Sequence, residues 1–275
     1  MPLLHALVLG IVQGLTEFLP ISSSGHLELI PWLFGWKDIA DESVSKAFDT
    51  ALHLGTLVAV VFYVRRELGR YIAGGLAALR SPRRASPTGR AAWLFIASAI
   101  PAGLVGVVAQ DWITASLGGA GSIAVSLIVF GGVLWWADRR SGERTLEDYR
   151  LRDAMLTGCA QVLALNPGTS RSGITISMAR VVGFSRDAAA RISFMMSIPV
   201  IAAAVVLQLG SLAKDGIPDG LGSALVVGIV ASGISGWFAM WSMIKLLRTR
   251  RFTGFVVYRV AVGVGVLVLL ATSVR

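Results

Sequence analysis

Long apolar runs, separated by short charged connections, dominate the pattern of hydrophobic and polar positions along the chain. A bilayer core about 30 Å thick needs roughly 20 consecutive apolar residues in a helix, and six segments meet this requirement. The pattern therefore predicts an all-α polytopic membrane protein. Its expected transmembrane spans are 47–64, 91–110, 121–137, 190–209, 221–244 and 254–273.

Composition supports this class and excludes others. Of the 275 residues, 55% are hydrophobic and only 15% are charged, which leaves too little polar surface to cover a soluble globule. The formal charge of +9 comes largely from Arg residues between the apolar runs, so we expect a lipid bilayer as the partner and no nucleic acid. The single cysteine, Cys159, excludes a disulfide framework and a Cys-based metal cluster.

The basic connections predict how the chain crosses the bilayer. Residues 65–90 carry seven Arg against one Glu, 138–152 carries five Arg, and 245–251 carries four basic residues and no acid. Since positively charged connections stay in the cytoplasm, all three are expected inside, and the connections 111–120 and 210–220 are expected outside. This alternation agrees with six spans.

Two further apolar stretches, 3–30 and 151–182, are broken in the middle by Pro and Gly and lack the pattern of a simple span. Given the predicted alternation, a stretch that dips into the bilayer and returns would enter from opposite faces in the two cases. This is the geometry of an inverted-topology repeat, in which each half is a broken re-entrant helical hairpin followed by three transmembrane helices. Repeat one would cover 1–138 and repeat two 151–275, within one membrane domain.

A shift of 148 positions aligns the two hairpins without gaps, and eight of 23 positions are identical. Some matches among Leu, Ala and Gly are expected by chance, whereas the polar matches are harder to explain in that way. The polar matches are Gln13 with Gln161, Ser22 with Ser170, and Ser24 with Ser172.

The centre of each hairpin predicts an anion site. The first helix should stop at Pro20 or at 166–168, and the second should start at the serines that follow, because serine is a strong N-cap. Both second helices then begin near mid-membrane, where their free N–H groups and positive dipole ends point towards each other. Unwound backbone is tolerated at this depth only around a protein-lined cavity, so we expect a cavity that favours a phosphate group.

Glu17 is the most informative residue of the first turn. An ionisable side chain at membrane depth is costly unless it is paired, so Glu17 calls for a metal ion, a proton or an Arg. A hard divalent ion, Mg²⁺ or Ca²⁺, suits an oxygen-rich site, with Glu17 as a ligand and Gln13 and Asp49 as further candidates. The alternatives are a Glu17–Arg pair that only holds the hairpin, and an Asp49 that only lies in the interface.

Ser23 and His26 are three residues apart, so in a helix capped near Ser23 both face one cavity and could act as nucleophile and base. Arg171 stands in the second turn where Ser23 stands in the first, and its planar fork of donors matches phosphate oxygens. We expect Glu17, Ser23, His26 and Arg171 to be catalytic. The surrounding hydroxyls are expected to bind the substrate, namely Ser22, Ser24, Ser170, Ser172 and Thr175.

Other basic residues have plainer interpretations. Arg259, near the start of the last predicted span, is expected to snorkel to the cytoplasmic side. Arg180, Arg186 and Arg191 fall where the second hairpin returns to the cytoplasm, which predicts solvated side chains that fix the topology.

Two motifs, QGLTEFLPISSSGH at 13–26 and PGTSRSGIT at 167–175, resemble those of the undecaprenyl-pyrophosphate phosphatases of the bacitracin-resistance type, and the similarity covers essentially the full length. The resemblance implies a multi-pass enzyme of the bacterial plasma (inner) membrane that hydrolyses undecaprenyl pyrophosphate to undecaprenyl phosphate and inorganic phosphate. This reaction would recycle the lipid carrier for peptidoglycan synthesis and confer bacitracin resistance. Dependence on Mg²⁺ or Ca²⁺ and an active site that faces outward are also implied.

Position by position, the resemblance assigns Glu17 to the family's acidic motif, and Ser23 and His26 to its essential hydroxyl and imidazole. Gln13 occupies a position where many members have Glu, so this chain has one carboxylate fewer for a metal. The family's phosphate-binding turn corresponds to Ser170, Arg171 and Thr175.

The sequence leaves three questions open. The group that attacks phosphorus could be Ser23, with Glu17 or His26 taking its proton, or it could be His26 itself or a water that His26 activates. A polyprenyl-phosphate flippase is the alternative function, because inverted repeats with broken helices are common among transporters. For the oligomeric state, a homodimer is one arrangement that the sequence allows.

Overall fold

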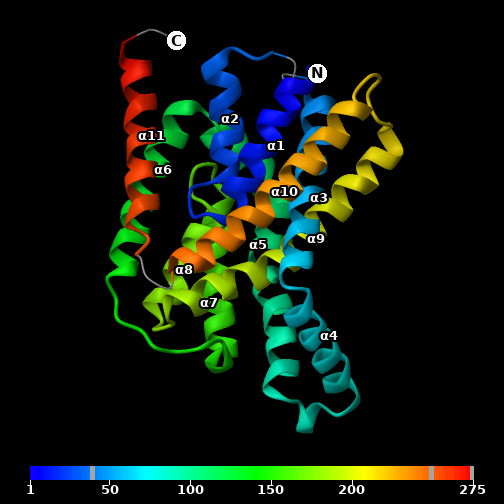
Figure 1. Ribbon diagram of the computed structural model, residues 1–275, viewed down its shortest axis with the longest axis vertical. Coiled ribbons are helices and arrows are strands. Elements are labelled where there is room, and N and C mark those ends of the chain that lie inside the picture. The colour runs from blue at the N-terminus through cyan, green and yellow to red at the C-terminus, as the bar shows by residue number, and fades with distance from the viewer. Residues whose placement is uncertain (38–40, 248–250, 273–275) are drawn as a thin grey trace.

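The computed structural model describes residues 1–37, 41–247 and 251–272, and within them every regular element is helical (Figure 1). The predicted basic connection 245–251 is described only in part, because Arg248 and Arg250 lie outside the described residues. Residue 273, the end of the last predicted span, also lies outside them.

Among the residues that the structure describes, six helices are long and apolar enough to cross a membrane, as the sequence predicts. They are α3 (Glu42–Tyr63), α5 (Pro87–Leu117), α6 (Ala120–Asp138), α9 (Arg186–Asp215), α10 (Gly222–Leu247) and α11 (Thr253–Ala271). With 31 and 30 residues, α5 and α9 are about 45 Å long and project beyond a hydrocarbon core of about 30 Å. The expected class, an all-α polytopic membrane protein, is confirmed.

Both predicted hairpins are broken where Pro and Gly interrupt them. The first helix of the first hairpin ends two residues before Pro20, which cannot donate a backbone hydrogen bond and so stops the helical ladder. The last helix of this hairpin continues four residues beyond the predicted end at residue 30. The first hairpin consists of α1 (Leu3–Phe18) and α2 (Ser23–Phe34), and the second of α7 (Leu151–Val162), the 3-10 helix η3 (Leu163–Leu165) and α8 (Arg171–Val181).

The first helix of each hairpin packs on a span of the other predicted half. α1 lies along α10, and α7 lies along α5. Small residues make this close approach feasible, since a Cβ on Gly14 would lie 2.0 Å from Ser235 Oγ and one on Gly158 would lie 2.5 Å from Ser98 O. An inverted repeat predicts such an exchange of partners. The repeat and its boundaries stay a prediction.

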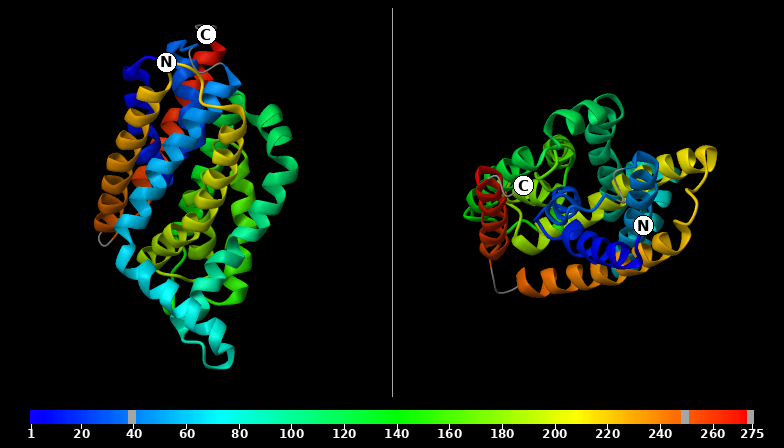
Figure 2. Two further views of the ribbon diagram at one scale, coloured as in Figure 1. Left: turned by 90° about the vertical axis from the view of Figure 1, so that its right-hand side faces the viewer. Right: turned by 90° about the horizontal axis from the view of Figure 1, so that it is seen from above.

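α4 (Arg65–Arg80) is a helix that the sequence analysis did not predict, because its arginines were interpreted as a charged connection. It packs closely against the start of α5, where a Cβ on Gly89 would lie 2.5 Å from the carbonyl oxygen of Gly74. After the short helix η1 (Pro82–Arg84) the chain turns back, so α4 and the start of α5 form a hairpin at the end of the molecule away from both termini (Figures 1 and 2).

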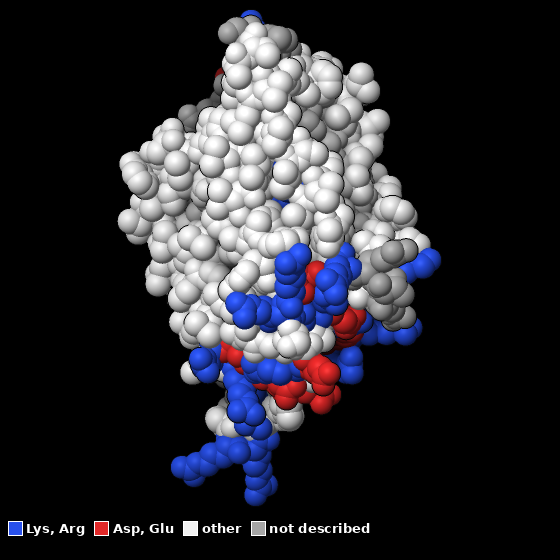
Figure 3. All heavy atoms as spheres, turned by 90° about the vertical axis from the view of Figure 1, so that its left-hand side faces the viewer, with Lys and Arg blue, Asp and Glu red and all other residues white. Residues whose placement is uncertain are grey.

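Charged side chains gather at this same end on the face shown in Figure 3, while most of the surface above them is uncharged. The positive-inside rule assigns this end to the cytoplasm.

The solvated role expected for Arg180 is wrong. Its side chain is buried, donates to the carbonyl of Phe184 at 2.5 Å and pairs with Asp138 at 3.9 Å. Arg186 shares the Asp138 carboxylate at 2.5 Å, and Arg191 pairs with carboxylates of α4 and of its own helix. These arginines therefore tie helices together at the charged end, in addition to marking the topology.

Candidate active site

Both turns are built around a serine with an unusual backbone. Ser22 and Ser170 have φ values of 76° and 75°, and no other non-glycine residue has a positive φ in the described part of the chain. The Ser22 Oγ accepts from the N–H of Gly25 at 3.3 Å, and the Ser170 Oγ from that of Gly173 at 3.0 Å, which confirms the predicted serine N-caps. Such a backbone costs on the order of 1–3 kcal/mol, so its presence at both turns indicates a geometric requirement.

Glu17 and Arg171 join the two turns. The Arg171 Nη2 lies 3.2 Å from the Glu17 Oε1, and both side chains are largely buried. A second link is the Ser172 hydroxyl, which donates to the carbonyl oxygen of Leu19 at 2.9 Å. The structure thus brings the predicted acid of one hairpin and the predicted phosphate ligand of the other into one site.

The Ser23 hydroxyl donates to the other oxygen of Glu17. The distance from Ser23 Oγ to Glu17 Oε2 is 2.6 Å, a short contact of the kind that a hydroxyl makes with an ionised carboxylate. Gln13 donates from its Nε2 to the same oxygen at 3.2 Å. Glu17 is therefore placed to accept the proton of Ser23 while Arg171 holds its second oxygen.

His26 lies in the site but its ring is bonded elsewhere. The Nδ1 atom lies 2.7 Å from the carbonyl oxygen of Ser22, and the Nε2 atom lies 2.8 Å from the hydroxyl of Tyr258. Within the described residues no hydrogen bond joins His26 to Ser23. The carboxylate of Glu17, rather than the imidazole, is the basic group beside the hydroxyl.

The hydroxyls of the second turn point inward. Thr175 is fully buried, and its Oγ1 donates to the backbone of Arg171 at 2.8 Å and lies 2.9 Å from the hydroxyl of Ser193. The carbonyl of Ser193 accepts from the Arg171 Nη1 at 3.3 Å. Of these groups, the carbonyl of Ser193 binds the guanidinium directly, and the Nε of Arg171 is buried without a partner.

The residues expected to bind a metal fall into two places. Gln13 lies beside Glu17, and its Oε1 is buried without a partner, so it is an available oxygen ligand. Asp49 instead pairs with His53 at 3.3 Å. In the described part of the chain no three His, Cys, Asp or Glu side chains gather as a metal cluster. One carboxylate and one amide oxygen suit Mg²⁺ that takes its remaining ligands from water and substrate phosphates.

A cavity of about 760 Å³ adjoins the first turn. Ser24, Asp49 and Pro167 line it, together with Asp111 in the last turns of α5. It therefore reaches from the two turns towards the end of the molecule opposite the arginine-rich hairpin. Ser24 is exposed, whereas its counterpart Ser172 is buried.

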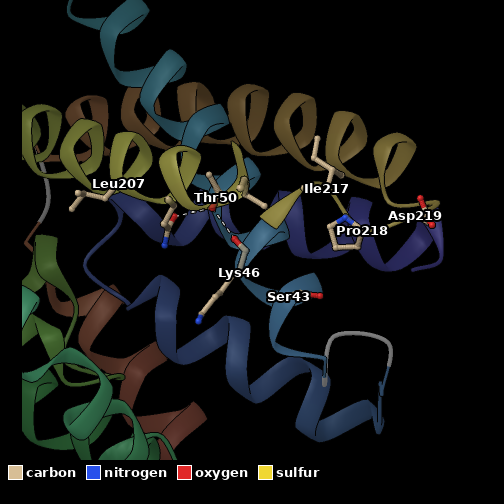
Figure 4. Close-up of a pocket in the computed structure, with 10 residues that line it drawn as sticks. Ser43, Lys46, Thr50, Leu207, Ile217, Pro218 and Asp219 are labelled. Carbon is tan, nitrogen blue, oxygen red and sulfur yellow. Dashed lines mark hydrogen bonds between the residues drawn. The ribbon is translucent and has the colours of Figure 1, made fainter. Parts of the chain in front are cut away.

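A second cavity of about 520 Å³ lies between the ends of α3 and α9 and contains none of the predicted site residues (Figure 4). Thr50 donates to the backbone of Lys46 at 2.7 Å and to the side chain of Gln208 at 2.9 Å there. Lys46 and Gln208 line both cavities, so the two lie next to each other.

The expectation that Arg259 snorkels to the cytoplasmic side is wrong. Its side chain is fully buried and donates to the carbonyls of Pro20 at 3.1 Å and of Gly168 at 2.9 Å, one in each turn. Sequence reasoning also did not find Ser193 or Tyr258. For Arg259 a signal was available, because it stands almost two turns inside the last span, too deep for a residue that marks the membrane surface.

Comparisons with known proteins identify the family of this chain. A model of the family described as bacitracin resistance protein BacA matches residues 6–265. An undecaprenyl-diphosphatase of Geobacter metallireducens is 42% identical over 269 residues, which make up 97% of this chain and 98% of that protein. Proteins of the same name from Desulforudis audaxviator and a Nocardioides species are 43% and 42% identical, over 96% and 98% of this chain and 97% of each relative. The chain belongs to the bacitracin resistance protein BacA family.

Proposed function

We propose that this protein hydrolyses undecaprenyl pyrophosphate to undecaprenyl phosphate and inorganic phosphate, with Ser23 as the nucleophile. The observation that carries the proposal is the contact of 2.6 Å between the Ser23 hydroxyl and the Glu17 carboxylate, with Arg171 bound to the second carboxylate oxygen at 3.2 Å. A hydroxyl beside a base and a guanidinium is the arrangement that phosphoryl transfer requires. The activity of the relatives agrees with this chemistry.

In the first step Ser23 Oγ attacks the terminal phosphorus as Glu17 takes its proton. The bond between Oγ and phosphorus forms, the bond from phosphorus to the bridging oxygen breaks, and undecaprenyl phosphate leaves with that oxygen and the proton from Glu17. A water then attacks the phosphoserine and gives a proton to Glu17, which returns it to Oγ as inorganic phosphate leaves. Ser23 and Glu17 thereby return to their starting protonation states.

Charge that develops on the phosphoryl oxygens is met by donors already in place. The donors that we assign to this charge are the unpartnered Nε of Arg171 and the N-termini of α2 and α8, which begin at the two turns. These groups need no reorganisation during the reaction. His26, which is bonded to Ser22 and Tyr258, supports the first turn, and this favours Ser23 over His26 as the attacking group.

Glu17 and Gln13 would hold a Mg²⁺ or Ca²⁺ ion. The unpartnered Gln13 Oε1 next to the carboxylate supports this assignment, and Asp49 is not needed for it. When bound, the ion would neutralise charge on the pyrophosphate oxygens.

The site would open to the outer face of the bacterial inner membrane. The cavity beside Ser24 on the side away from the arginine-rich hairpin supports outward access. Undecaprenyl phosphate released there would re-enter the lipid carrier cycle of peptidoglycan synthesis, and removal of the pyrophosphate form would confer bacitracin resistance. A homodimer stays a prediction that light scattering of the purified protein would test.

The test uses detergent-purified protein, undecaprenyl pyrophosphate and Mg²⁺ or Ca²⁺. Release of inorganic phosphate is expected, and a single turnover with substrate labelled in the terminal phosphate should leave the label on Ser23 before release. If phosphate appears without any labelled serine, direct attack by water replaces Ser23 as the mechanism. If no phosphate appears and labelled lipid moves across liposome membranes, the flippase is the function instead.

A further inference from the structure

We propose that Tyr258 and Arg259, adjacent on α11, are positioning residues for the reaction at the two turns. Arg259 holds the turns at a fixed separation, and Tyr258 fixes the orientation of His26. The inference rests on the proposed function and adds two residues that the local motifs of the turns do not contain.

Arg259 donates to carbonyls of both turns at once. In the first turn it reaches Pro20 at 3.1 Å, and in the second it reaches Gly168 at 2.9 Å and Thr169 at 3.0 Å. Its Nε donates to the carbonyl of Leu127 on α6 at 3.1 Å. A single rigid guanidinium therefore connects two unwound segments to a transmembrane helix.

The turns need such a donor. Their carbonyls have left the helical ladder at a depth where water is scarce, and an unpaired carbonyl there is costly. Arg259 is itself buried and has no carboxylate partner in the described part of the chain, so its charge is compensated by these carbonyl dipoles. The carbonyls thus need the guanidinium as a donor, and the guanidinium needs the carbonyls to compensate its charge.

The guanidinium also lies against the start of α8. A Cβ built on Gly173 would be 3.1 Å from the Arg259 Nη1, so a glycine keeps this approach open. The positive charge consequently lies beside the first turn of α8, the helix that follows Ser170. It reinforces the attraction of this end for an anion.

Tyr258 acts on the first turn. Its hydroxyl lies 2.8 Å from the His26 Nε2, and the two rings stack with centroids 5.6 Å apart. Since the other ring nitrogen is bonded to the carbonyl of Ser22, the imidazole is held at both ends. The ring of His26 is therefore fixed between the serine cap of α2 and the last span.

The first experiment compares Arg259→Met and Arg259→Lys with Arg180→Met. Arg180 is the matched control, since it is also buried and bonded to backbone carbonyls, but at the charged end away from the turns. Phosphate release is measured per folded protein. Because a misplacement of about 1 Å at a reacting centre costs on the order of 10²-fold, we expect Arg259→Met to lose about that much in kcat with KM changed less than about fivefold.

Arg259→Lys, which keeps a charged donor, should recover part of the loss, whereas Arg180→Met should lower thermal stability and leave kcat per folded protein within about threefold of the unaltered protein. Equal kcat losses in Arg259→Met and Arg180→Met would show a general effect of destabilisation and overturn the proposal.

A second measurement does not depend on activity. Hydrogen exchange of the backbone amides of 21–26 and 168–174 should accelerate in Arg259→Met and stay unchanged in Arg180→Met. If the unaltered protein releases no phosphate, the proposed function fails while this exchange still tests the role of Arg259. If that protein is active and exchange at both turns is unchanged in Arg259→Met, the inference alone fails.

Tyr258→Phe tests the second residue, with Tyr149→Phe as its control. The hydroxyl of Tyr149 lies 3.0 Å from that of Thr157, and burial raises the pKa of Tyr149 to about 12, so the control removes a protonated, bonded hydroxyl elsewhere. We expect Tyr258→Phe to lower kcat per folded protein roughly tenfold at unchanged KM, and Tyr149→Phe to change it by less than about twofold. Equal kcat values for Tyr258→Phe and the unaltered protein would remove Tyr258 from the proposal.

Discussion

The two turns share a backbone and differ in what their side chains do. Ser22 and Ser170 adopt nearly the same positive φ and cap the helices that follow. At the next positions, however, the first turn has Ser23, which contacts Glu17, whereas the second has Arg171, which reaches across to the same carboxylate. The difference teaches that a duplicated backbone can supply two anion-binding helix ends while the chemistry is divided between them.

The hydroxyls follow the same division. Ser24 faces the cavity, while its counterpart Ser172 donates to the first turn, and Thr175 donates to the backbone carbonyl of Arg171. The hydroxyls of the second turn thus bond to protein groups around Arg171 and to the first turn. The expectation that all five hydroxyls bind substrate stays a prediction, and the structure favours Ser24 over Ser172 and Thr175 for direct contact.

The largest effect should come from removing the hydroxyl of Ser23, whose equivalent in the second turn is Arg171. Ser23→Ala is expected to lower kcat by about 10³-fold or more, because no attacking group remains beside Glu17. Phosphate release measures it. Ser242→Ala is the control, since in the described part of the chain its hydroxyl bonds only to the backbone of its own helix, α10.

Exchanging the side chains of Ser23 and Arg171 tests the difference between the two turns most directly. The double variant Ser23→Arg with Arg171→Ser should release no phosphate, because the serine would then lie in the turn that carries no carboxylate. Substantial phosphate release by this variant would show that the two turns are interchangeable after all.

A smaller loss is expected for Arg171→Lys. Lysine keeps the charge but lacks the planar fork that binds Glu17 and leaves Nε free, so kcat should fall on the order of 10²-fold. Steady-state kinetics with undecaprenyl pyrophosphate measures it. Activity within twofold of the unaltered protein would mean that charge alone is sufficient at this position.

Gln13 and Gln161 occupy equivalent positions in the predicted repeat, and both are buried. Only Gln13 lies beside a carboxylate, so Gln13→Leu should raise the Mg²⁺ concentration needed for half-maximal activity by roughly tenfold, and Gln161→Leu should not. Titration of Mg²⁺ after treatment with a chelator measures both. An equal shift in both variants would show that the metal does not depend specifically on Gln13 in the first turn.

The smallest effect concerns the link between the turns. Ser172→Ala removes the bond to Leu19 and should lower the free energy of unfolding by about 1 kcal/mol, whereas Ser24→Ala, at an exposed position, should leave stability unchanged. Thermal denaturation in detergent compares the two. Equal stability of both variants would show that the bond contributes nothing.

Local signals predicted much of this architecture. Apolar length is a direct measure of a span, and Pro20 and the serine caps act on their own neighbours, so spans, breaks and helix starts could be predicted from the sequence. Glu17 and Arg171 could be paired because each is an isolated charge at membrane depth. The positions of the turns thus followed from short-range chemistry.

The rest depends on contacts between distant parts of the chain. Tyr258 meets His26 across 232 positions, and no local pattern indicates which helix will lie beside a given turn. α4 was missed for a different reason, because its arginines predicted topology and obscured its helical pattern. The choice of Glu17 over His26 as the neighbour of Ser23 also depends on side-chain orientation, which spacing along a helix does not determine.

Arg259 has a consequence for how the protein is made. An Arg at the centre of an isolated transmembrane helix costs about 2.5–3.5 kcal/mol during insertion by the translocon. Arg259 lies less than two turns from the start of α11, so its cost is smaller, but it still lowers the tendency of α11 to enter the bilayer. Its carbonyl partners belong to segments that the ribosome completes earlier, since α11 is the last helix described. The order of synthesis therefore makes burial of the Arg259 charge easier, because its carbonyl acceptors are already in the membrane when α11 is inserted.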